Sequence, residues 1–367
     1  MSNIPWDFVW QRHQTLASLF AREHEVAFLE LPGVRRIGWR DLGRVARRGL
    51  ALLRRTRAGT TTDGVQVLRP WVLPATNRLF CGWNRRVLLR TLGDWREGVE
   101  TLVNYSPTPT ALATAQIVRH RRAVYDCTDN WSAVPGVPES ALRAEAEWLR
   151  RADLTVVPSR ALETRHGNRA RRLERLPHGA LVDRFLPAAA TRPEVEPITL
   201  LYYGHIHRQH LAFEAIAEIA RLRPHWRILL VGPVKTPGLF PMNVELVGQQ
   251  PHVALAGWVA RAHVLLLPYV LNAYTECVLP AKTYECLATG RPIVAAPLPE
   301  LVADFRATMS FAYSGSEYVS AVESALVEDT SEAAARRIAL ATRNSWEMRY
   351  HTLVGLLGGL AEGEVQS

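Results

Sequence analysis

The sequence lacks the features that would place the chain across a membrane. No run of eighteen or more consecutive apolar residues occurs, so no segment has the length and character of a transmembrane helix. The first residues, MSNIPWDFVWQRHQ, contain no basic stretch followed by an apolar one, and so predict no secretory signal peptide. These absences predict a cytoplasmic protein.

Cysteine is scarce, and its positions are scattered. The four cysteines, Cys81, Cys127, Cys277 and Cys286, form no CxxC pair. This pattern argues against a disulfide framework and against a zinc site, and it fits reduced thiols. We therefore expect no bound metal.

Several functional signatures are also missing. No GxGxxG follows a predicted strand, which argues against a nicotinamide-dependent oxidoreductase. Zinc-finger spacing, an aromatic ribonucleoprotein motif and a helix-turn-helix pattern are absent, so we expect no nucleic-acid partner. The net charge of +9, mostly from arginine, instead favours nucleotide phosphates or acidic lipid headgroups as partners.

The pattern that is present alternates short apolar runs with amphipathic segments. A length of 367 residues with 48% hydrophobic content suggests two domains. The alternation is typical of βαβ units, so we predict the α/β class, with parallel sheets covered on both faces. In the first half, strands are expected at 24–32, 65–74, 101–106, 122–129, 154–159 and within 172–185.

A Pro- and Ala-rich stretch at 187–197 is interpreted as a linker, after which the alternation of apolar runs and amphipathic segments begins again. A helix is expected at 211–224 and a terminal helix or helix pair at 345–363. The strands expected in this half are 198–204, 226–233, 243–248, 263–269, 291–297 and 308–314.

Residues 39–57 form a basic amphipathic pattern. Leu42, Val45, Leu52 and Leu53 share one side at helical spacing, and arginines occupy the opposite side. Such a helix can lie on an anionic membrane surface, here the inner face of the plasma membrane. It can equally pack on its own sheet with a solvated arginine face, and the sequence leaves both interpretations open.

The segment 278–301 carries an acid and a base within an apolar context. Pro280 and Gly290 predict a helix of roughly three turns between them. A helix start after a strand is an anion site, to which Lys282 would add a charge. Glu285 could accept hydrogen bonds from two sugar hydroxyls. The same spacing also fits an ordinary ion pair on a solvated face.

Six segments together resemble the GT-B glycosyltransferases of family 4, and more narrowly the teichuronic-acid-biosynthesis type. The most specific of them reads HVLLLPYVLNAYTECVLPAKTYECLATGRPIVAAPLPEL. The segments are 4–21, 124–136, 151–162, 176–185, 201–217 and 263–301.

The resemblance implies two Rossmann-like domains facing across a cleft. Residues 1–187 would bind the acceptor, with 345–367 crossing back onto them, and residues 197–344 would bind a nucleoside-diphosphate-sugar. The implied activity is a metal-independent retaining transfer to a hydroxyl of a polysaccharide, lipid-linked or other small acceptor, without a cofactor. Two alternatives stay open: a non-catalytic nucleotide-sugar-binding partner subunit, and a nucleotide-sugar epimerase of the same fold.

The resemblance also implies roles for individual residues. The proposed catalytic groups are Asp129, Lys282 and Arg208. The donor would contact Tyr203, Gly204, His205, Arg208, Cys277, Val278, Leu279, Lys282 and Glu285. The acceptor would contact Trp6, Asp7, Gln11, Arg12, Asp126, Asn130 and Trp131.

The chain departs from the family at two places. In many members a glutamate that touches the donor sugar stands eight positions before the residue matching Glu285, and here that position is Cys277, with Glu276 beside it. Relatives usually begin with a full strand, whereas only MSNIP precedes Trp6 here. Either the first strand is very short, or the start of the chain is truncated and the central sheet lacks a member.

Overall fold

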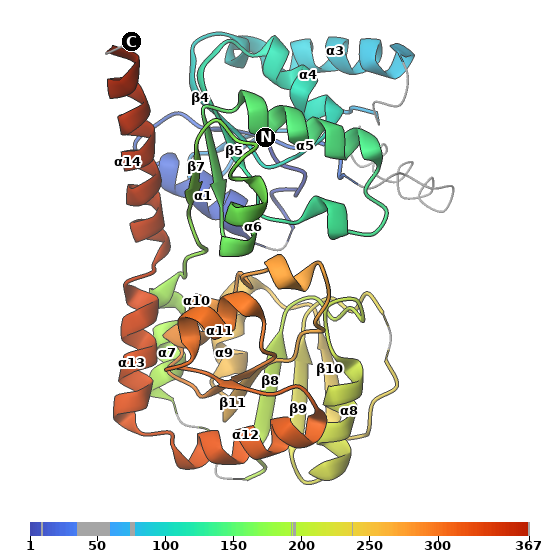
Figure 1. The fold of residues 1–367 in the computed structure, drawn as a ribbon, viewed down its shortest axis with the longest axis vertical. Helices are drawn as coiled ribbons and strands as arrows, with labels where there is room; N and C mark the ends of the chain where they lie inside the picture. The colour runs from blue at the N-terminus through green and yellow to red at the C-terminus, as the bar shows by residue number, and fades with distance from the viewer. Residues whose placement is uncertain are drawn as a thin grey trace. The chain divides into compact units, whose positions relative to one another are not determined.

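The protein is described by a computed structural model (Figure 1). The chain divides into two compact units. The N-terminal unit comprises Met1–Leu176 with Tyr350–Ser367, and the C-terminal unit comprises Pro177–Arg349. The arginine-rich segment 39–57 lies outside the described residues. The described residues are 1–8, 10–34, 59–73, 78–191, 193, 196–236 and 238–365.

The C-terminal unit is built on a six-stranded parallel sheet. Its strands form where short apolar runs are bounded by glycine, proline or polar residues. Counted within the unit, the strand order is 3-2-1-4-5-6, the doubly wound arrangement. The pairing runs β10 (Val244–Gly248), β9 (Arg227–Val231), β8 (Thr199–Tyr203), β11 (Val264–Leu267), β12 (Ile293–Ala295) and β13 (Ser310–Phe311).

Helices cover both faces of this sheet (Figure 1). Successive strand side chains point to opposite faces, so Leu200 and Tyr202 join one apolar core while Leu201 and Tyr203 join the other. The first core includes α8 (Phe213–Leu222) and α12 (Gly315–Val327). The second includes α7 (Val182–Ala190), α9 (Leu255–Val259), α10 (Thr283–Ala288), α11 (Pro299–Phe305) and α13 (Ser331–Thr342).

The N-terminal unit carries a four-stranded parallel sheet and a three-stranded mixed sheet. The first pairs β4 (Val99–Asn104), β5 (His120–Asp126), β6 (Leu154–Val157) and β7 (Leu173–Arg175) in chain order. In the second, β1 (Ala27–Leu29) pairs in parallel with β3 (Gln66–Leu68), and β2 (Gly59–Thr60) pairs antiparallel with β3.

The first two residues connect these two sheets. The Ser2 amide donates to the Leu29 carbonyl (2.9 Å), while the Met1 amino nitrogen donates to the Val103 carbonyl (2.6 Å). The Tyr105 amide returns a bond to the Met1 carbonyl (3.0 Å). Met1 and Ser2 thus occupy the place of a very short strand between β1 and β4.

The helices of the N-terminal unit begin at recognisable caps. The hydroxyls of Thr108 and Ser159 accept hydrogen bonds from amides of the first helical turns that follow them. The described helices are α1 (Arg12–Phe20), α3 (Arg78–Leu92), η2 (Gly93–Arg96), α4 (Pro109–Ile117), η3 (Trp131–Ala133), α5 (Glu139–Arg151) and α6 (Arg160–His166).

The last helix, α14 (Trp346–Val365), begins in the C-terminal unit and continues into the N-terminal one. Its Tyr350 hydroxyl donates to Glu23 (3.1 Å), and its Leu357 carbonyl accepts from Arg122 (2.8 Å). Leu353 is buried in the same unit. The closing segment of the chain therefore packs with the domain formed by the beginning of the chain.

Each predicted apolar run overlaps a strand, whereas β2 was not predicted, and the α/β class is confirmed. The contacts divide the chain at Leu176, ahead of the expected linker at 187–197, because α7 packs against the helices of the C-terminal unit. The helix expected between Pro280 and Gly290 is shorter than three turns. Residues 280–282 form a turn, in which the Thr283 amide donates to the Pro280 carbonyl (2.9 Å), and α10 starts only at Thr283.

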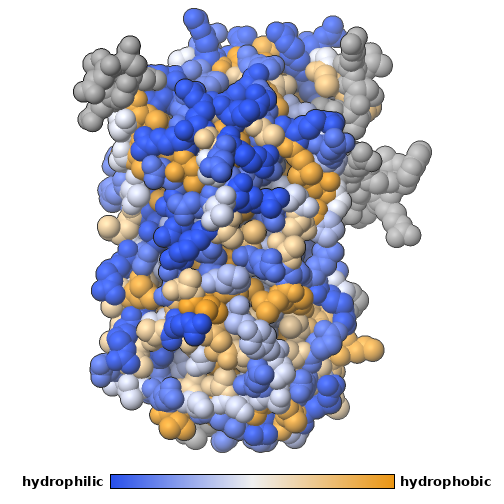
Figure 2. Space-filling model, viewed as in Figure 1, coloured by the Kyte–Doolittle hydropathy of each residue, from blue (hydrophilic) through white to orange (hydrophobic). Residues whose placement is uncertain are grey.

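Hydrophobic and hydrophilic groups are intermixed on the surface that Figure 2 shows. Larger apolar side chains that are exposed include Trp71 and Trp83 of the N-terminal unit. Among the described residues, no helix is both long enough and apolar enough to cross a membrane.

Candidate functional site

The C-terminal unit has a topological switch point between β8 and β11. From β8 the chain moves outward to β9 and β10, and then returns to β11 on the other side of β8. In open α/β sheets, ligands bind beyond the carboxyl ends of strands at such a point. Here those ends are Tyr203–Gly204 and Leu267–Tyr269. The topology therefore identifies one edge of the sheet before any side chain is considered.

Lys282 places its ammonium group at this edge. Its Nζ donates to the Tyr202 and Tyr269 hydroxyls, both at 3.2 Å, and lies 4.3 Å from the centre of the Tyr202 ring. Burial acts to lower the pKa of Lys282, but the two tyrosines raise it, and the net shift is upward. The side chain therefore carries its positive charge at neutral pH.

The surroundings of Lys282 leave its charge uncompensated. Both acceptors are neutral hydroxyls, and the ammonium has three N–H groups. No carboxylate pairs with Lys282 within the described part of the chain. One N–H is therefore available to an anionic ligand. The solvated ion pair with Glu285, which the spacing also allowed, does not form.

Two glycines make room at this edge. Gly204 has φ +140°, and a Cβ there would come within 2.3 Å of the Lys282 Nζ. Gly232, which follows β9, has φ +144°, and its Cβ would lie 1.9 Å from the Gly204 carbonyl oxygen. Only glycine fits both the backbone conformation and the space. The turns after β8 and β9 thus approach each other and Lys282 more closely than side chains would allow.

Glu285 lies one helical turn beyond Lys282 and is held from two sides. Its Oε2 accepts from the Tyr203 hydroxyl, and its Oε1 lies next to His252 Nε2, both at 3.3 Å. Arg184 contacts His252 Nδ1, and because a guanidinium only donates, Nδ1 is the acceptor and Nε2 carries the proton. The carboxylate is 13% exposed, and its lone pairs can accept further hydrogen bonds.

The other donor-side candidates lie in the loops around this edge. Arg208 is exposed, pairs with Glu214, and lies over the Phe213 ring. His205 is partly buried; burial, together with the charges of Lys282 and Lys235, lowers its pKa to about 4, so its ring is neutral at pH 7. Cys277 ends the short η5 helix (Thr275–Cys277), and Val278 and Leu279 follow it on the approach to Lys282.

In the N-terminal unit, Arg12 and Asp126 contact each other. Arg12 Nε lies 2.7 Å from Asp126 Oδ2, its Nη1 donates to the Leu176 carbonyl (2.9 Å), and both side chains are buried. This pair ties α1 to the ends of β5 and β7. The contact gives the two charges a structural role, whereas their proposed part in acceptor binding stays a prediction.

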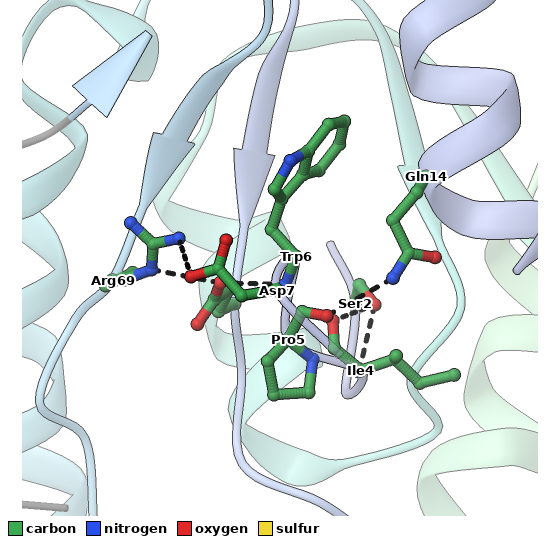
Figure 3. Close-up of polar contacts among 8 residues, drawn as sticks. Ser2, Ile4, Pro5, Trp6, Asp7, Gln14 and Arg69 are labelled. Carbon is green, nitrogen blue, oxygen red and sulfur yellow. Dashed lines mark hydrogen bonds and ion pairs between the residues drawn. The ribbon is translucent and has the colours of Figure 1, made fainter. Parts of the chain in front are cut away.

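Trp6 and Asp7 lie in the segment before α1 (Figure 3), and Gln11 is the residue that immediately precedes this helix. Glu30 accepts from the Trp6 amide (3.0 Å) and from Arg69 Nε (3.1 Å), while Asp7 accepts from Arg69 Nη2 (3.0 Å). Trp6 itself is buried against Trp10 and Phe28. Gln11 caps α1 through a reciprocal contact with Gln14.

Asp129, Asn130 and Trp131 form the loop at the carboxyl end of β5. The Asp129 carboxylate accepts from Thr128 (3.1 Å) and is partly exposed. Asn130 accepts from Ser132 (2.8 Å), and Trp131 is buried. Of these three, Asp129 presents an ionised side chain near the surface.

Three residues beside Lys282 and Glu285 escaped the sequence analysis: Tyr202, Tyr269 and His252. Tyr202 is the last but one residue of β8, Tyr269 lies two residues after the neighbouring β11, and His252 lies in η4 (His252–Ala254). A usable signal existed for the tyrosines, since both sit at the carboxyl ends of predicted strands that flank the switch point. Nothing in the local sequence distinguishes His252.

The sequence is similar to known proteins over part of its length. Residues 197–337 match the family described as glycosyl transferases group 1. A protein of Bacillus subtilis (strain 168) named as a teichuronic acid biosynthesis glycosyltransferase, TuaH, is 26% identical over 203 residues, which are 48% of this chain and 51% of that protein. The chain thus matches about half the length of this curated relative.

Solved structures share the fold over nearly the whole chain. Sucrose-phosphate synthase from Thermosynechococcus elongatus superposes with a TM-score of 0.69 at 15% identity, covering 95% of this chain and 92% of that one. HepE from Anabaena, in complex with UDP-glucose, gives 0.62 at 15% identity, covering 91% and 99%. The fold is GT-B, as the resemblance implied.

Proposed function

We propose that this chain, whose residues 197–337 match glycosyl transferases group 1, is a retaining glycosyltransferase that uses a nucleoside-diphosphate-sugar. The acceptor is a hydroxyl of a polysaccharide, lipid-linked or other small molecule. The observation that carries the proposal is the uncompensated Lys282 ammonium at the switch point of the C-terminal sheet. A fixed positive charge there suits a diphosphate.

Stabilisation of the leaving diphosphate is the main chemical requirement of the transfer. Negative charge grows on the phosphate oxygens as the bond to the sugar breaks, and a preorganised cation lowers the energy of that state. Lys282 supplies such a cation, so the proposed reaction needs no catalytic metal. The acceptor hydroxyl attacks from the side on which the diphosphate departs, which retains the anomeric configuration.

Glu285 is proposed to hold the ribose of the donor. Tyr203 and His252 fix its orientation, and it remains 13% exposed. A charged acceptor facing two hydroxyls forms stronger hydrogen bonds than a neutral one. Gly204 and its neighbours would bring backbone close to the phosphates, with Arg208 as a further contact.

Asp129 is proposed to act on the acceptor side. It is an ionised side chain at the carboxyl end of a parallel strand, where ligands of such sheets bind. We expect Asp129→Asn to abolish transfer while leaving donor binding unchanged. Loss of donor binding in this variant would contradict the assignment.

The proposal is tested with a panel of nucleotide-sugars, starting with UDP-glucose because HepE is solved with that molecule. Binding is followed by calorimetry, and nucleoside-diphosphate release is followed with and without acceptor extracts. Acceptor-dependent release with an unchanged anomeric configuration, seen by NMR, supports the transferase. Binding without turnover would support a non-catalytic partner, and sugar conversion without release an epimerase.

A peripheral membrane contact at the cytoplasmic face is also proposed. Trp71 and Trp83, which follow the segment 39–57 in the sequence, are exposed, and their ring centres are 6.0 Å apart. Arg85 and Arg86 of α3 are exposed as well. Exposed indole rings beside guanidinium groups suit the interface of an anionic membrane.

Sedimentation with lipid vesicles tests this contact. We expect binding to vesicles that contain anionic lipid, reduced by the double change Trp71→Ser and Trp83→Ser and by high salt. Equal sedimentation with purely zwitterionic vesicles, or no effect of the double change, would contradict it.

A further inference from the structure

Three potential metal ligands converge in the interior of the N-terminal unit. Cys127 follows β5, Glu145 belongs to α5, and His166 ends α6. The Cys127 Sγ lies 3.7 Å from Glu145 Oε1 and 3.9 Å from His166 Nε2, and the latter two atoms are 3.8 Å apart. All three side chains are buried. The group is assembled from three elements and is invisible as a sequence motif.

The spacing of these atoms fits a metal site, although the Cys127 thiol also lies within weak sulfur hydrogen-bond distance of Glu145 and His166. A separation of 3.8 Å between nitrogen and oxygen is too long for a hydrogen bond. The three atoms form a nearly equilateral triangle with edges of 3.7, 3.8 and 3.9 Å, so a tetrahedrally bound ion above its centre would lie about 2.3 Å from each of them. Zinc bonds measure about 2.3 Å to cysteine sulfur and about 2.0–2.2 Å to histidine nitrogen and carboxylate oxygen.

We propose that Cys127, Glu145 and His166 form a structural site for a divalent transition metal ion, with zinc as the expected ion. A thiolate, a carboxylate and a neutral imidazole balance a dication, so the filled site buries no net charge. Arg165 and Arg169 act on the site electrostatically, but both are exposed to water, which screens their charge. The combination of soft sulfur with imidazole favours zinc over magnesium or calcium.

Neighbouring groups can complete the coordination. The Asp129 carbonyl oxygen lies 3.6 Å from the Cys127 sulfur, so it or a water can provide a fourth ligand. The buried Tyr125 hydroxyl lies close enough to Cys127 to interact with its sulfur, and it can donate to the thiolate. Metal binding at Nε2 leaves the ring proton of His166 on the buried Nδ1, where we expect an ordered water.

The site would be structural because its ligands are closed off from solvent. A metal there would join the ends of β5 and α6 to α5 and would fix the loop 128–131, which carries Asp129. The inference does not depend on the proposed transferase activity. A cysteine nucleophile is a poor alternative, since a buried sulfur offers a substrate no access.

Metal content and cobalt spectroscopy test the site in the full chain. We expect the protein, produced with zinc and purified without chelator, to contain close to one zinc ion per chain, as measured by elemental (ICP) mass spectrometry. Replacement by Co²⁺ should produce a thiolate-to-cobalt charge-transfer band. Removing the metal with a chelator should lower Tm.

Cysteine variants provide the matched comparison. Cys127→Ala should lose the ion, the band and the chelator effect, whereas Cys286→Ala, which removes a buried thiol of the C-terminal unit, should keep all three. Should Cys127→Ala fail to fold, Glu145→Gln and His166→Gln are expected to weaken cobalt binding at least tenfold. Wild-type protein without zinc and without the band after cobalt addition, or a band that survives in Cys127→Ala, would overturn the proposal.

Discussion

The two units place charge at the carboxyl end of a central strand in opposite ways. In the N-terminal unit, Arg12 and Asp126 lie 2.7 Å apart and are both almost fully buried. In the C-terminal unit, Lys282 has only neutral hydroxyls as partners and remains partly exposed. One charge is neutralised within the protein, and the other is not.

This difference separates a structural contact from a binding site. A buried ion pair satisfies itself, so removing one member leaves the other desolvated and unpaired. A cation among neutral hydroxyls can still attract an anion, and its loss should cost the fold less than the loss of one member of a buried ion pair. Stability should therefore respond to the pair in the N-terminal unit and ligand affinity to the lysine in the C-terminal unit. Four predictions test this contrast.

The largest expected effect is on stability. Arg12→Met should lower the free energy of unfolding by about 3–5 kcal/mol, because Asp126 would be left buried without its counter-charge. Urea denaturation followed by circular dichroism measures the change. The double replacement Arg12→Met with Asp126→Leu should recover part of the loss, since it removes both charges.

Arg143→Met is the matched control for this comparison. Arg143 pairs with Glu139 one turn away on α5, and both side chains are largely exposed. Its loss should cost about 0–1 kcal/mol. A change below 1 kcal/mol in Arg12→Met as well would contradict the distinction between buried and exposed pairs.

The second effect is on donor binding. Lys282→Met should weaken UDP binding by about 1.5–3 kcal/mol, the scale of a hydrogen bond to a charged group, with little change in unfolding free energy. Isothermal calorimetry measures the affinity. Pyrophosphate binding should be weakened by a similar amount, because Lys282 is proposed to contact the diphosphate.

Arg261→Met controls for the lost positive charge. Arg261 also lies over an aromatic ring, that of Trp258, but it precedes β11 and so belongs to the amino-terminal edge of the sheet. UDP affinity should not change in this variant. Equal weakening in both variants would indicate a nonspecific charge effect.

A smaller and more selective effect is expected for Glu285. Glu285→Ala should weaken UDP binding by about 1–3 kcal/mol, the scale of lost hydrogen bonds to a charged group, and should leave pyrophosphate binding unchanged. The two ligands thus separate ribose contact from phosphate contact. The exposed Glu328, at the end of α12, provides the control variant Glu328→Ala. Weaker binding of both UDP and pyrophosphate to Glu285→Ala would contradict the proposal that Glu285 contacts the ribose.

The sequence predicted the strands and the Lys282–Glu285 segment because both are local signals. Short apolar runs identify strands, and an acid and a base one turn apart in an apolar helix are visible in a few residues. The predicted start of α10 was wrong because Pro280 suits a turn as well as a first helical position. In the structure, the hydrogen bond between Pro280 and Thr283 closes a turn.

The partners of these residues were not predictable in the same way. Tyr202, Tyr269 and His252 come from separate segments and meet Lys282 or Glu285 only in the assembled C-terminal unit, where the register of β8 and β11 places the two tyrosines. Arg12 and Asp126 are 114 positions apart, and nothing in either segment indicates that the other neutralises it. Composition shows which charges exist, whereas topology decides which of them remain unpaired.

The smallest effect concerns His205, whose titration reports the charge of Lys282. Burial, followed by the positive charges of Lys282 and Lys235, lowers its pKa from 6.5 to about 4. Between these two values the unfolded chain binds a proton that the folded chain does not, so stability falls as pH drops from about 6.5 to about 4. Removing Lys282 should raise the folded pKa of His205 and reduce this loss. NMR titration of the imidazole should therefore show a midpoint near pH 4 in the wild type, a higher one in Lys282→Met, and no change in Arg261→Met. A midpoint that is the same with and without Lys282 would mean that the ammonium exerts no field at the edge where the donor is proposed to bind.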